Sequence, residues 1–308
     1  MTINRRQFIT RSAVTGAALA SPLFGRQLLA SGKPLFKISL AQWSLHKGFF
    51  EGVYDPLDFA RIARGQFGFK AIEYVNQFYF DTLNDKLVSE LRKRADGEGV
   101  ISNLIMIDNE GDLGDPDEAS RKKAVENHYR WADAAHVLGC QSIRVNARST
   151  GSWDEQMKLA ADGLSSLADY CQKLGLNVLV ENHGGLSSNA KWLTGVMTLA
   201  DHKGVGTLPD FGNFIIDRET GESYDRYLGT EELMPFAKAV SAKTYNFDEE
   251  GNEKTIDYLR IMGIVVKAGY SDWVGIEYEG EALAEEEGIV KTRQLLERVR
   301  DQLEQAAT

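Results

Sequence analysis

Eight short apolar runs, rich in β-branched residues, alternate with amphipathic helical patterns along the 308-residue chain. The starts of successive runs lie 29 to 41 residues apart. A strand followed by a helix at this spacing is typical of parallel strands joined by crossover helices. Eight such units predict a single (β/α)8 TIM barrel, for which about 250 residues is usual. The runs cover residues 37–41, 69–75, 100–107, 141–145, 176–181, 205–210, 239–244 and 274–278.

The segment 154–174 gives the clearest helical pattern between these runs. Its apolar residues follow one stripe, Ser152 and Glu155 form a capping-box pattern before it, and Gly175 follows it. An open, doubly wound sheet is the alternative architecture. It usually has a glycine-rich first turn, but no GxGxxG follows the first run and no GxxxxGK[ST] occurs in the chain. The barrel is therefore the favoured fold.

The first thirty residues form a separate segment. Arg5 and Arg6 precede Phe8 and a modestly apolar, alanine-rich stretch at 13–24, which resembles a twin-arginine export signal. This resemblance implies a signal at residues 1–30, a barrel domain at 31–308 and a periplasmic or secreted protein. Because this route exports folded proteins, a metal ion could be loaded before export. A basic N-terminal tail without an export role is the alternative.

Charge and composition exclude several classes of partner. The chain has a formal charge of −10, and the first 30 residues carry four arginines and no acid, so the other 278 carry −14. Such an acidic surface repels nucleic acid. No apolar run approaches the roughly 20 residues that span a membrane. Cys140 and Cys171 are expected to be buried thiols, with a disulfide between them as the alternative.

Three carboxylates end neighbouring apolar runs, where a barrel places its active site. Glu181 ends the fifth run, Asp210 the sixth, and Glu277 lies near the end of the eighth. Burying three like charges together is costly unless a cation or protons compensate them. Carboxylate oxygens suit Mg²⁺ or Mn²⁺, so the sequence predicts one divalent metal ion held by these residues. In the alternative, each carboxylate caps a helix or pairs with an arginine.

These motifs resemble the xylose isomerase-like barrel superfamily over roughly residues 35–305. Its sugar epimerases hold a divalent ion with Glu, Asp, His and Glu from strands 5 to 8, which implies Glu181, Asp210 and Glu277 as ligands. The ion is then Mn or Mg, with Co or Zn as further options. The resemblance also implies substrate contacts by His183 and Asn213.

The seventh run departs from the family pattern, because the family's H-x-K is Ser241-x-Lys243. A protonated lysine cannot be a ligand. The fourth ligand is then water, Ser241 or an acid of the following loop such as Asp248. Lys243 is expected to contact the substrate.

Other side chains at strand ends are further candidates for substrate binding, each with a structural alternative. Trp43 could face a sugar ring and His46 a hydroxyl, or they could be a packed tryptophan and a surface histidine. The remaining candidates are Glu73, which could instead be structural, and Asn146 and Arg148, which could instead bind a loop carbonyl.

Two further groups of residues lie near or outside these strand ends. Glu279 shares strand parity with Glu277, so it either points into the site or pairs with Lys243. His128 and His136 are expected to be ordinary helix histidines.

The resemblance implies an isomerase or epimerase that acts on an unphosphorylated sugar or keto-sugar. Glu181 and Glu277 would move the proton beside a carbonyl through an enediolate, and Lys243 or His183 would stabilise the oxyanion. The expected partner is therefore a small carbohydrate, and family members often form homo-oligomers.

Three other functions stay open on the sequence alone. They are a keto-glycoside lyase or C-deglycosidase, a non-catalytic sugar-binding barrel, and an endonuclease IV-like enzyme. The last is the poorest, because that chemistry needs a histidine-rich zinc site and a basic groove, and the chain has 5 histidines.

Overall fold

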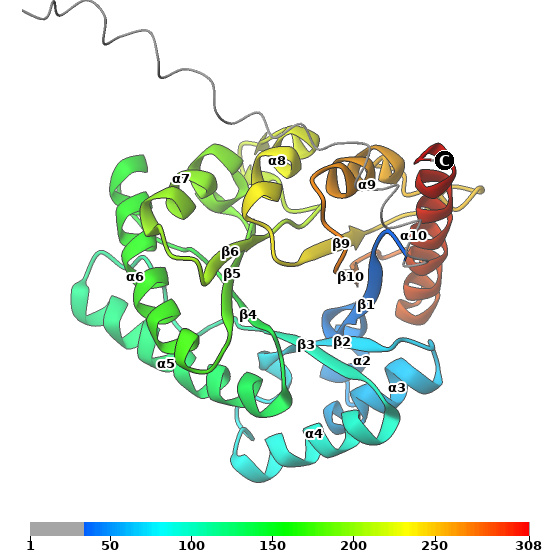
Figure 1. Ribbon diagram of the computed structural model, residues 1–308, viewed down its shortest axis with the longest axis horizontal. Coiled ribbons are helices and arrows are strands. Elements are labelled where there is room, and N and C mark those ends of the chain that lie inside the picture. The colour runs from blue at the N-terminus through cyan, green and yellow to red at the C-terminus, as the bar shows by residue number, and fades with distance from the viewer. Residues whose placement is uncertain (1–33, 308) are drawn as a thin grey trace, which may run out of the picture.

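The computed structural model describes residues 34–307. Eight parallel strands surround a central axis, and helices cover their outer side (Figure 1). The predicted (β/α)8 barrel is thereby confirmed. The export signal expected at residues 1–30 lies outside the described residues. The strands are β1 (Lys37–Ala41), β2 (Ala71–Val75), β3 (Ile101–Met106), β4 (Ser142–Val145), β5 (Asn177–Glu181), β6 (Val205–Leu208), β9 (Val240–Thr244) and β10 (Trp273–Tyr278).

Continuous ladders join the strands in the order β6-β5-β4-β3-β2-β1-β10-β9. Between β6 and β9 the barrel closes through single bridges, Thr207 with Ala237 and Asp210 with Ser241. The expected sixth strand extended to Asp210, but its ladder with β5 ends at Leu208, opposite Glu181. Pro209 follows directly and has no N–H with which to donate a bond to a neighbouring strand. The Ser241 amide instead donates to the Pro209 carbonyl oxygen at 2.9 Å. We call these bridges between β6 and β9, together with this hydrogen bond, the β6–β9 junction.

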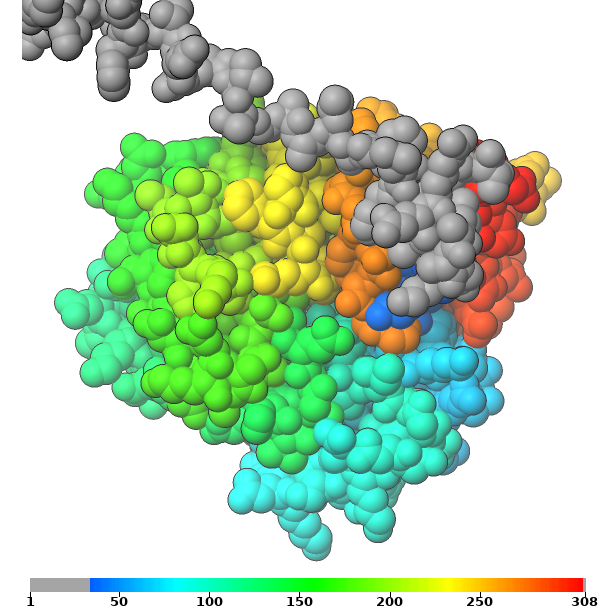
Figure 2. Space-filling view, in the orientation of Figure 1, coloured from blue at the N-terminus to red at the C-terminus, as the bar shows by residue number. Residues whose placement is uncertain are grey.

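The outer helices pack side by side around the barrel, from cyan α4 through green α5 to α7 (Figure 2). Helix α6 has the predicted capping box, with Ser152 and Glu155 bonded reciprocally. The helices are α2 (His46–Phe50), α3 (Phe59–Gly65), α4 (Asp85–Glu98), α5 (Glu118–Leu138), α6 (Trp153–Lys173), α7 (Ala190–Ala200), α8 (Arg226–Leu233), α9 (Tyr258–Lys267) and α10 (Glu285–Ala307).

A short hairpin of β7 (Ile215–Asp217) and β8 (Glu222–Ser223) follows β6 and was not expected from the sequence. It lies between the end of β6 and α8, on the segment that also carries Asp210.

Helix α6 lies very close to the loop after β3. A Cβ added at Gly163 would lie 1.8 Å from the Leu113 carbonyl oxygen. Only glycine fits this approach without movement of the backbone.

The barrel interior combines an apolar cluster with the buried carboxyl group of Glu73. The cluster comprises Ala41, Val75, Leu104, Met106, Leu179, Leu208 and Ala239. Glu73 precedes Val75 by two residues on the same face of β2. Its Oε1 accepts hydrogen bonds from Ser39 Oγ at 2.7 Å and Asn103 Nδ2 at 3.0 Å. Burial raises the pKa of Glu73 to about 7.

The cysteines and helix histidines occupy structural positions. Cys140 and Cys171 are buried free thiols, so the disulfide alternative is wrong for this structure. His128 and His136 lie on α5, where Nδ1 of each bonds to a backbone carbonyl. Within residues 34–307, no helix is long and apolar enough to cross a membrane.

Candidate active site

Three buried carboxylates meet at the C-terminal end of the barrel strands. Glu181 ends β5, Asp210 follows β6 and Glu277 lies on β10. One carboxylate oxygen from each lies within 4.8 Å of the others, and all three residues are buried. The structure thus brings together the three side chains that the sequence suggested as metal ligands. We call these three residues the triad.

Ser241 and Lys243 on β9 contact this triad from one side. Ser241 Oγ donates to Asp210 Oδ2 at 2.6 Å and lies 3.1 Å from Glu277 Oε2. Lys243 Nζ lies 3.1 Å from Glu277 Oε1, 3.3 Å from Glu279 Oε2 and 3.7 Å from Asp210 Oδ2. Glu279 therefore pairs with Lys243, and it also lines the cavity described below, so both placements that the sequence left open are found. The lysine supplies a buried positive charge to the carboxylates.

Arg144 provides a second buried cation. Its Nε bonds to Glu181 Oε2, and its Nη1 lies 2.9 Å from Asp108 Oδ1. Asn213 Nδ2 donates to the other oxygen, Glu181 Oε1, at 2.7 Å. Both oxygens of Glu181 are thus held by donors from two other parts of the barrel.

These neighbours separate the pKa values of the carboxylates. Burial would raise the pKa of Glu181, but Arg144 and other cationic groups outweigh it, so the pKa lies below the usual value. Burial raises the pKa of Asp210 to about 6, although Lys243 works against it. Burial and the neighbouring carboxylates raise the pKa of Glu277 to about 8. One carboxyl is therefore held ionised while another retains a proton near neutral pH.

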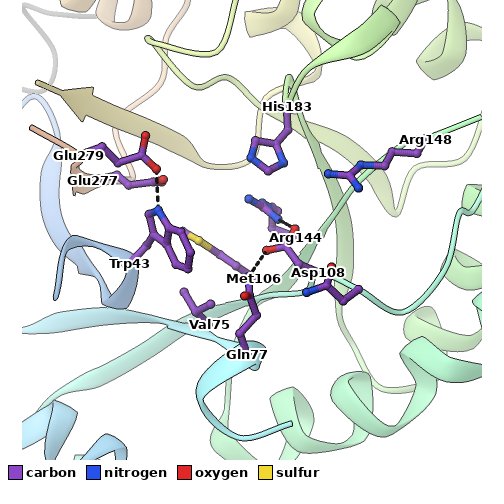
Figure 3. A pocket seen from close by; sticks show the side chains of 11 residues that line it. Trp43, Val75, Gln77, Met106, Asp108, Arg144, Arg148, His183, Glu277 and Glu279 are labelled. Atoms are coloured by element: carbon purple, nitrogen blue, oxygen red, sulfur yellow. Dashed lines mark hydrogen bonds and ion pairs between the residues drawn. The ribbon is translucent and has the colours of Figure 1, made fainter. Parts of the chain in front are cut away.

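A cavity of about 240 Å³ is lined by one residue of the triad, Glu277 (Figure 3). Trp43, Glu277 and Glu279 lie on one side, and Arg144, Arg148 and Asp108 on the other. Its volume is below the roughly 300–1,000 Å³ of pockets for drug-sized ligands, so it suits a small polar molecule. Its lining comprises Trp43, Val75, Gln77, Met106, Asp108, Asn109, Arg144, Arg148, His183, Glu277 and Glu279.

Several predicted substrate-binding residues reach this cavity. His183 lines it, and Nδ1 lies 2.9 Å from Asn146 Oδ1. Trp43 Nε1 donates to Glu279 Oε1 at 2.6 Å. Arg148 lines the cavity from an exposed position. His183, Trp43 and Arg148 are thus placed where a ligand could touch them.

Other candidates lie behind the cavity wall. Asn146, Asn213 and Lys243 bond to residues of the site but do not line the cavity. His46 stacks on Trp43 with ring centroids 4.7 Å apart, so it supports the tryptophan. Glu73 faces Ser39 and Asn103 inside the barrel and does not line the cavity, which corrects its expected substrate contact to the structural alternative.

Asp248, considered as a fourth ligand, lies in a turn away from the triad. Its Oδ1 accepts a hydrogen bond from the Asn252 amide at 2.7 Å. It is not part of the carboxylate group that could hold a metal.

The sequence reasoning missed Asp108 and Arg144. Asp108 follows directly after the third apolar run, so the rule that selected the other strand-end acids could have found it. Arg144 is a charged residue within an apolar run, two residues before Asn146 on the same face of the strand. Its pairing with Glu181 is visible only when β4 and β5 are placed side by side.

Comparison with known proteins places the chain in a family. A model of the xylose isomerase-like TIM barrel family matches residues 60–299. The chain belongs to this family. The triad can therefore be compared with the sites of other family members.

Solved structures share this fold at low sequence identity. A 3-keto-D-glucoside 4-epimerase from E. coli aligns with a TM-score of 0.67 and 16% identity, covering 85% of this chain and 99% of that one. A D-tagatose 3-epimerase-like protein aligns with a TM-score of 0.68 and 16% identity, covering 89% and 100%. A family protein from Mycobacterium smegmatis was solved with magnesium, at a TM-score of 0.64, 16% identity and coverages of 89% and 98%.

One curated relative matches a short segment. The C-glycoside deglycosidase alpha subunit of Arthrobacter globiformis is 43% identical over 54 residues. This segment is 18% of the present chain and 15% of that protein.

Proposed function

We propose that this protein is a divalent-metal-dependent isomerase or epimerase of an unphosphorylated sugar or keto-sugar. The observation that carries the proposal is the meeting of three buried carboxylates, of which Glu277 lines a small polar cavity. Fold similarity to the 3-keto-D-glucoside and tagatose epimerases supports this class of reaction. The reaction is proton transfer at a carbon next to a carbonyl group.

The residues present fit a hard divalent cation. Asp108, Glu181, Asp210, Glu277 and Glu279 form a group of carboxylates whose contacting cations, in the described residues, are Arg144 and Lys243. Five acids against two cations leave an excess of negative charge when all are ionised. Glu181, Asp210 and Glu277 would hold the ion, which we expect to be Mn or Mg, with Co or Zn as further options. When bound, the ion would polarise a substrate carbonyl.

Glu181 and Glu277 are assigned to the two proton transfers. Arg144 and Asn213 hold Glu181 ionised, as a base requires. Glu277 lines the cavity, so it is placed to exchange the second proton with a substrate bound there. Its raised pKa belongs to the metal-free site, because an ion held by Glu277 displaces the proton. Glu181 does not itself line the cavity, so the substrate has to pass the lining residues to reach its carboxylate.

His183 is assigned to substrate binding. Burial lowers its pKa, so the ring is neutral near neutral pH. If Nδ1 carries the proton that bonds to Asn146 Oδ1, Nε2 is left to accept a hydrogen bond from a sugar hydroxyl. Lys243 is already surrounded by carboxylates, so its main role is to compensate their charge.

The central experiment combines metal analysis with proton exchange. Purified protein should contain about one divalent ion per chain, and Glu181→Ala should lose it while Asp248→Ala, a turn carboxylate, retains it. Free ketoses and 3-keto-glucosides are then incubated in D₂O, and deuterium at the carbon next to the carbonyl is followed by NMR. Metal-free protein together with a fully folded, unchanged Glu181→Ala variant would contradict the proposal.

A keto-glycoside lyase or C-deglycosidase is the second candidate. The 54-residue match to the C-glycoside deglycosidase alpha subunit favours it. The products separate the two reactions, because an epimerase gives a stereoisomer of equal mass and a lyase releases the aglycone. Sugar binding that survives a chelator, without turnover of any substrate, would instead indicate a binding protein.

We also propose export through the twin-arginine route, based on Arg5 and Arg6. Cell fractionation should place the mature protein outside the cytoplasm. Replacement of both arginines by lysine should retain it inside, and an unchanged distribution would contradict this proposal.

A further inference from the structure

An aromatic cluster adjoins the mouth of the cavity. Trp43 lines the cavity, and the rings of Phe50 and Phe78 lie 6.1 and 6.3 Å from its ring. Phe50 and Phe78 lie 5.0 Å apart. We call these three residues the mouth cluster. They belong to the segments after β1 and β2, at the barrel end where loops determine specificity.

The mouth cluster presents a large apolar side chain to solvent. Phe50 is 58% exposed, and nearby in sequence Val53 is 67% exposed. Single exposed apolar residues are common, but Phe50 packs on the half-buried rings of Phe78 and Trp43, and Trp43 lines the cavity, which indicates a binding surface. Leu199, which is 52% exposed, lies on the outer helix α7 and provides a comparison away from the cavity.

Contacts below the surface hold these rings in place. Trp43 donates a hydrogen bond to Glu279 and stacks on His46. Phe78 packs against the buried ring of Phe49 at 5.0 Å. A surface whose rings are already fixed loses little side-chain freedom when a ligand binds.

We propose that the mouth cluster is a subsite for a planar aromatic aglycone of a glycoside whose sugar occupies the cavity. The proposal rests on the proposed function, because it assumes a sugar in the cavity. The cavity of about 240 Å³ suits one small polar unit, so a large substituent must extend beyond it. On the Trp43 side such a substituent meets aromatic rings, which favour a planar apolar partner.

The test compares binding of methyl and 4-nitrophenyl glycosides of the same sugar. Titration calorimetry measures their Kd values with the full chain, using β-glucosides, β-galactosides and their 3-keto derivatives. The 4-nitrophenyl compound should bind at least about fivefold more tightly than its methyl partner, since stacking on aromatic rings contributes about 1 kcal/mol. Phe50→Ser should remove most of this ratio, and Leu199→Ser should leave it unchanged.

Several outcomes would overturn the subsite. They are equal affinities of the two glycosides, an unchanged ratio in Phe50→Ser, or no binding of either glycoside. Loss of a dimer in Phe50→Ser, without a change in the ratio, would assign the cluster to an interface between two copies. In each case, proton exchange on a free ketose would show whether the proposed function still stands.

Discussion

Replacement of Glu73 by glutamine provides a direct test of the buried carboxyl inside the barrel. Glu73 is 1% exposed, and both hydrogen bonds from Ser39 and Asn103 go to the same oxygen. Burial raises its pKa to about 7, whereas the unfolded chain has the ordinary value of 4.5. Glutamine keeps the shape and one acceptor oxygen but carries no titrating proton.

The sign of the effect follows from proton binding. Between pH 4.5 and 7 the folded protein holds a proton on Glu73 that the unfolded chain releases. The stability contributed by this proton is fully present below pH 4.5 and is lost as pH rises to about 7. At about 1.4 kcal/mol per pKa unit, the loss between about pH 5.5 and about pH 8 is about 2 kcal/mol.

Urea unfolding followed by tryptophan fluorescence would measure this effect across the same pH range. The free energy of unfolding of Glu73→Gln, minus that of the wild type, should rise by about 2 kcal/mol over this range. Glu249→Gln, at an exposed turn position, is the control. Parallel curves for Glu73→Gln and the wild type would refute the reasoning.

Three further predictions concern the site and its support. The affinity for Mn²⁺ should fall by up to about tenfold per pH unit below about pH 8, because a proton on Glu277 competes with the ion. A Kd that stays constant across this pH range in titration calorimetry would contradict this prediction. Arg144→Met should lower the free energy of unfolding by about 3–5 kcal/mol, because it leaves a buried charge unpaired. Arg148→Met, at an exposed position, should change this free energy little, and equal urea midpoints of the two variants would count against the ion pair. Gly163→Ala should lower the free energy of unfolding by about 1–3 kcal/mol, because the added Cβ clashes with the Leu113 carbonyl oxygen. An unchanged Tm would show that α6 can shift freely.

The sequence predicted the barrel well because each of its eight parallel strands carries a local signal. The eight runs correspond to the eight barrel strands, and the capping box of α6 is visible in Ser152 and Glu155 alone. The hairpin of β7 and β8 gives no such signal, since its strands have 3 and 2 residues. Short, exposed strands lack the apolar alternation on which such a prediction depends.

The site was predictable in its acids and less so in its charge pairing. Glu181, Asp210 and Glu277 end their strands, so the fold rule alone brings them together. The partner of Glu181 is Arg144, and this contact depends on the register of β4 against β5. The depth of Glu73 was not predictable, because strand parity gives the direction of a side chain while its depth in the barrel depends on register. The β2–β3 pairing shifts register beside Glu73.

The β6–β9 junction is the place where we expect ligand binding to affect local opening of the barrel. Seven strand contacts are continuous ladders, whereas this one rests on single bridges, including the bridge between Asp210 and Ser241. Asp210 belongs to the triad, and Ser241 bonds to two of its carboxylates. If a ligand binds only while the β6–β9 bridges are formed, its binding stabilises these bridges. Formation of the bridges favours ligand binding by the same free energy. Amide hydrogen exchange at Phe211 and Ser241 should therefore report occupancy of the site.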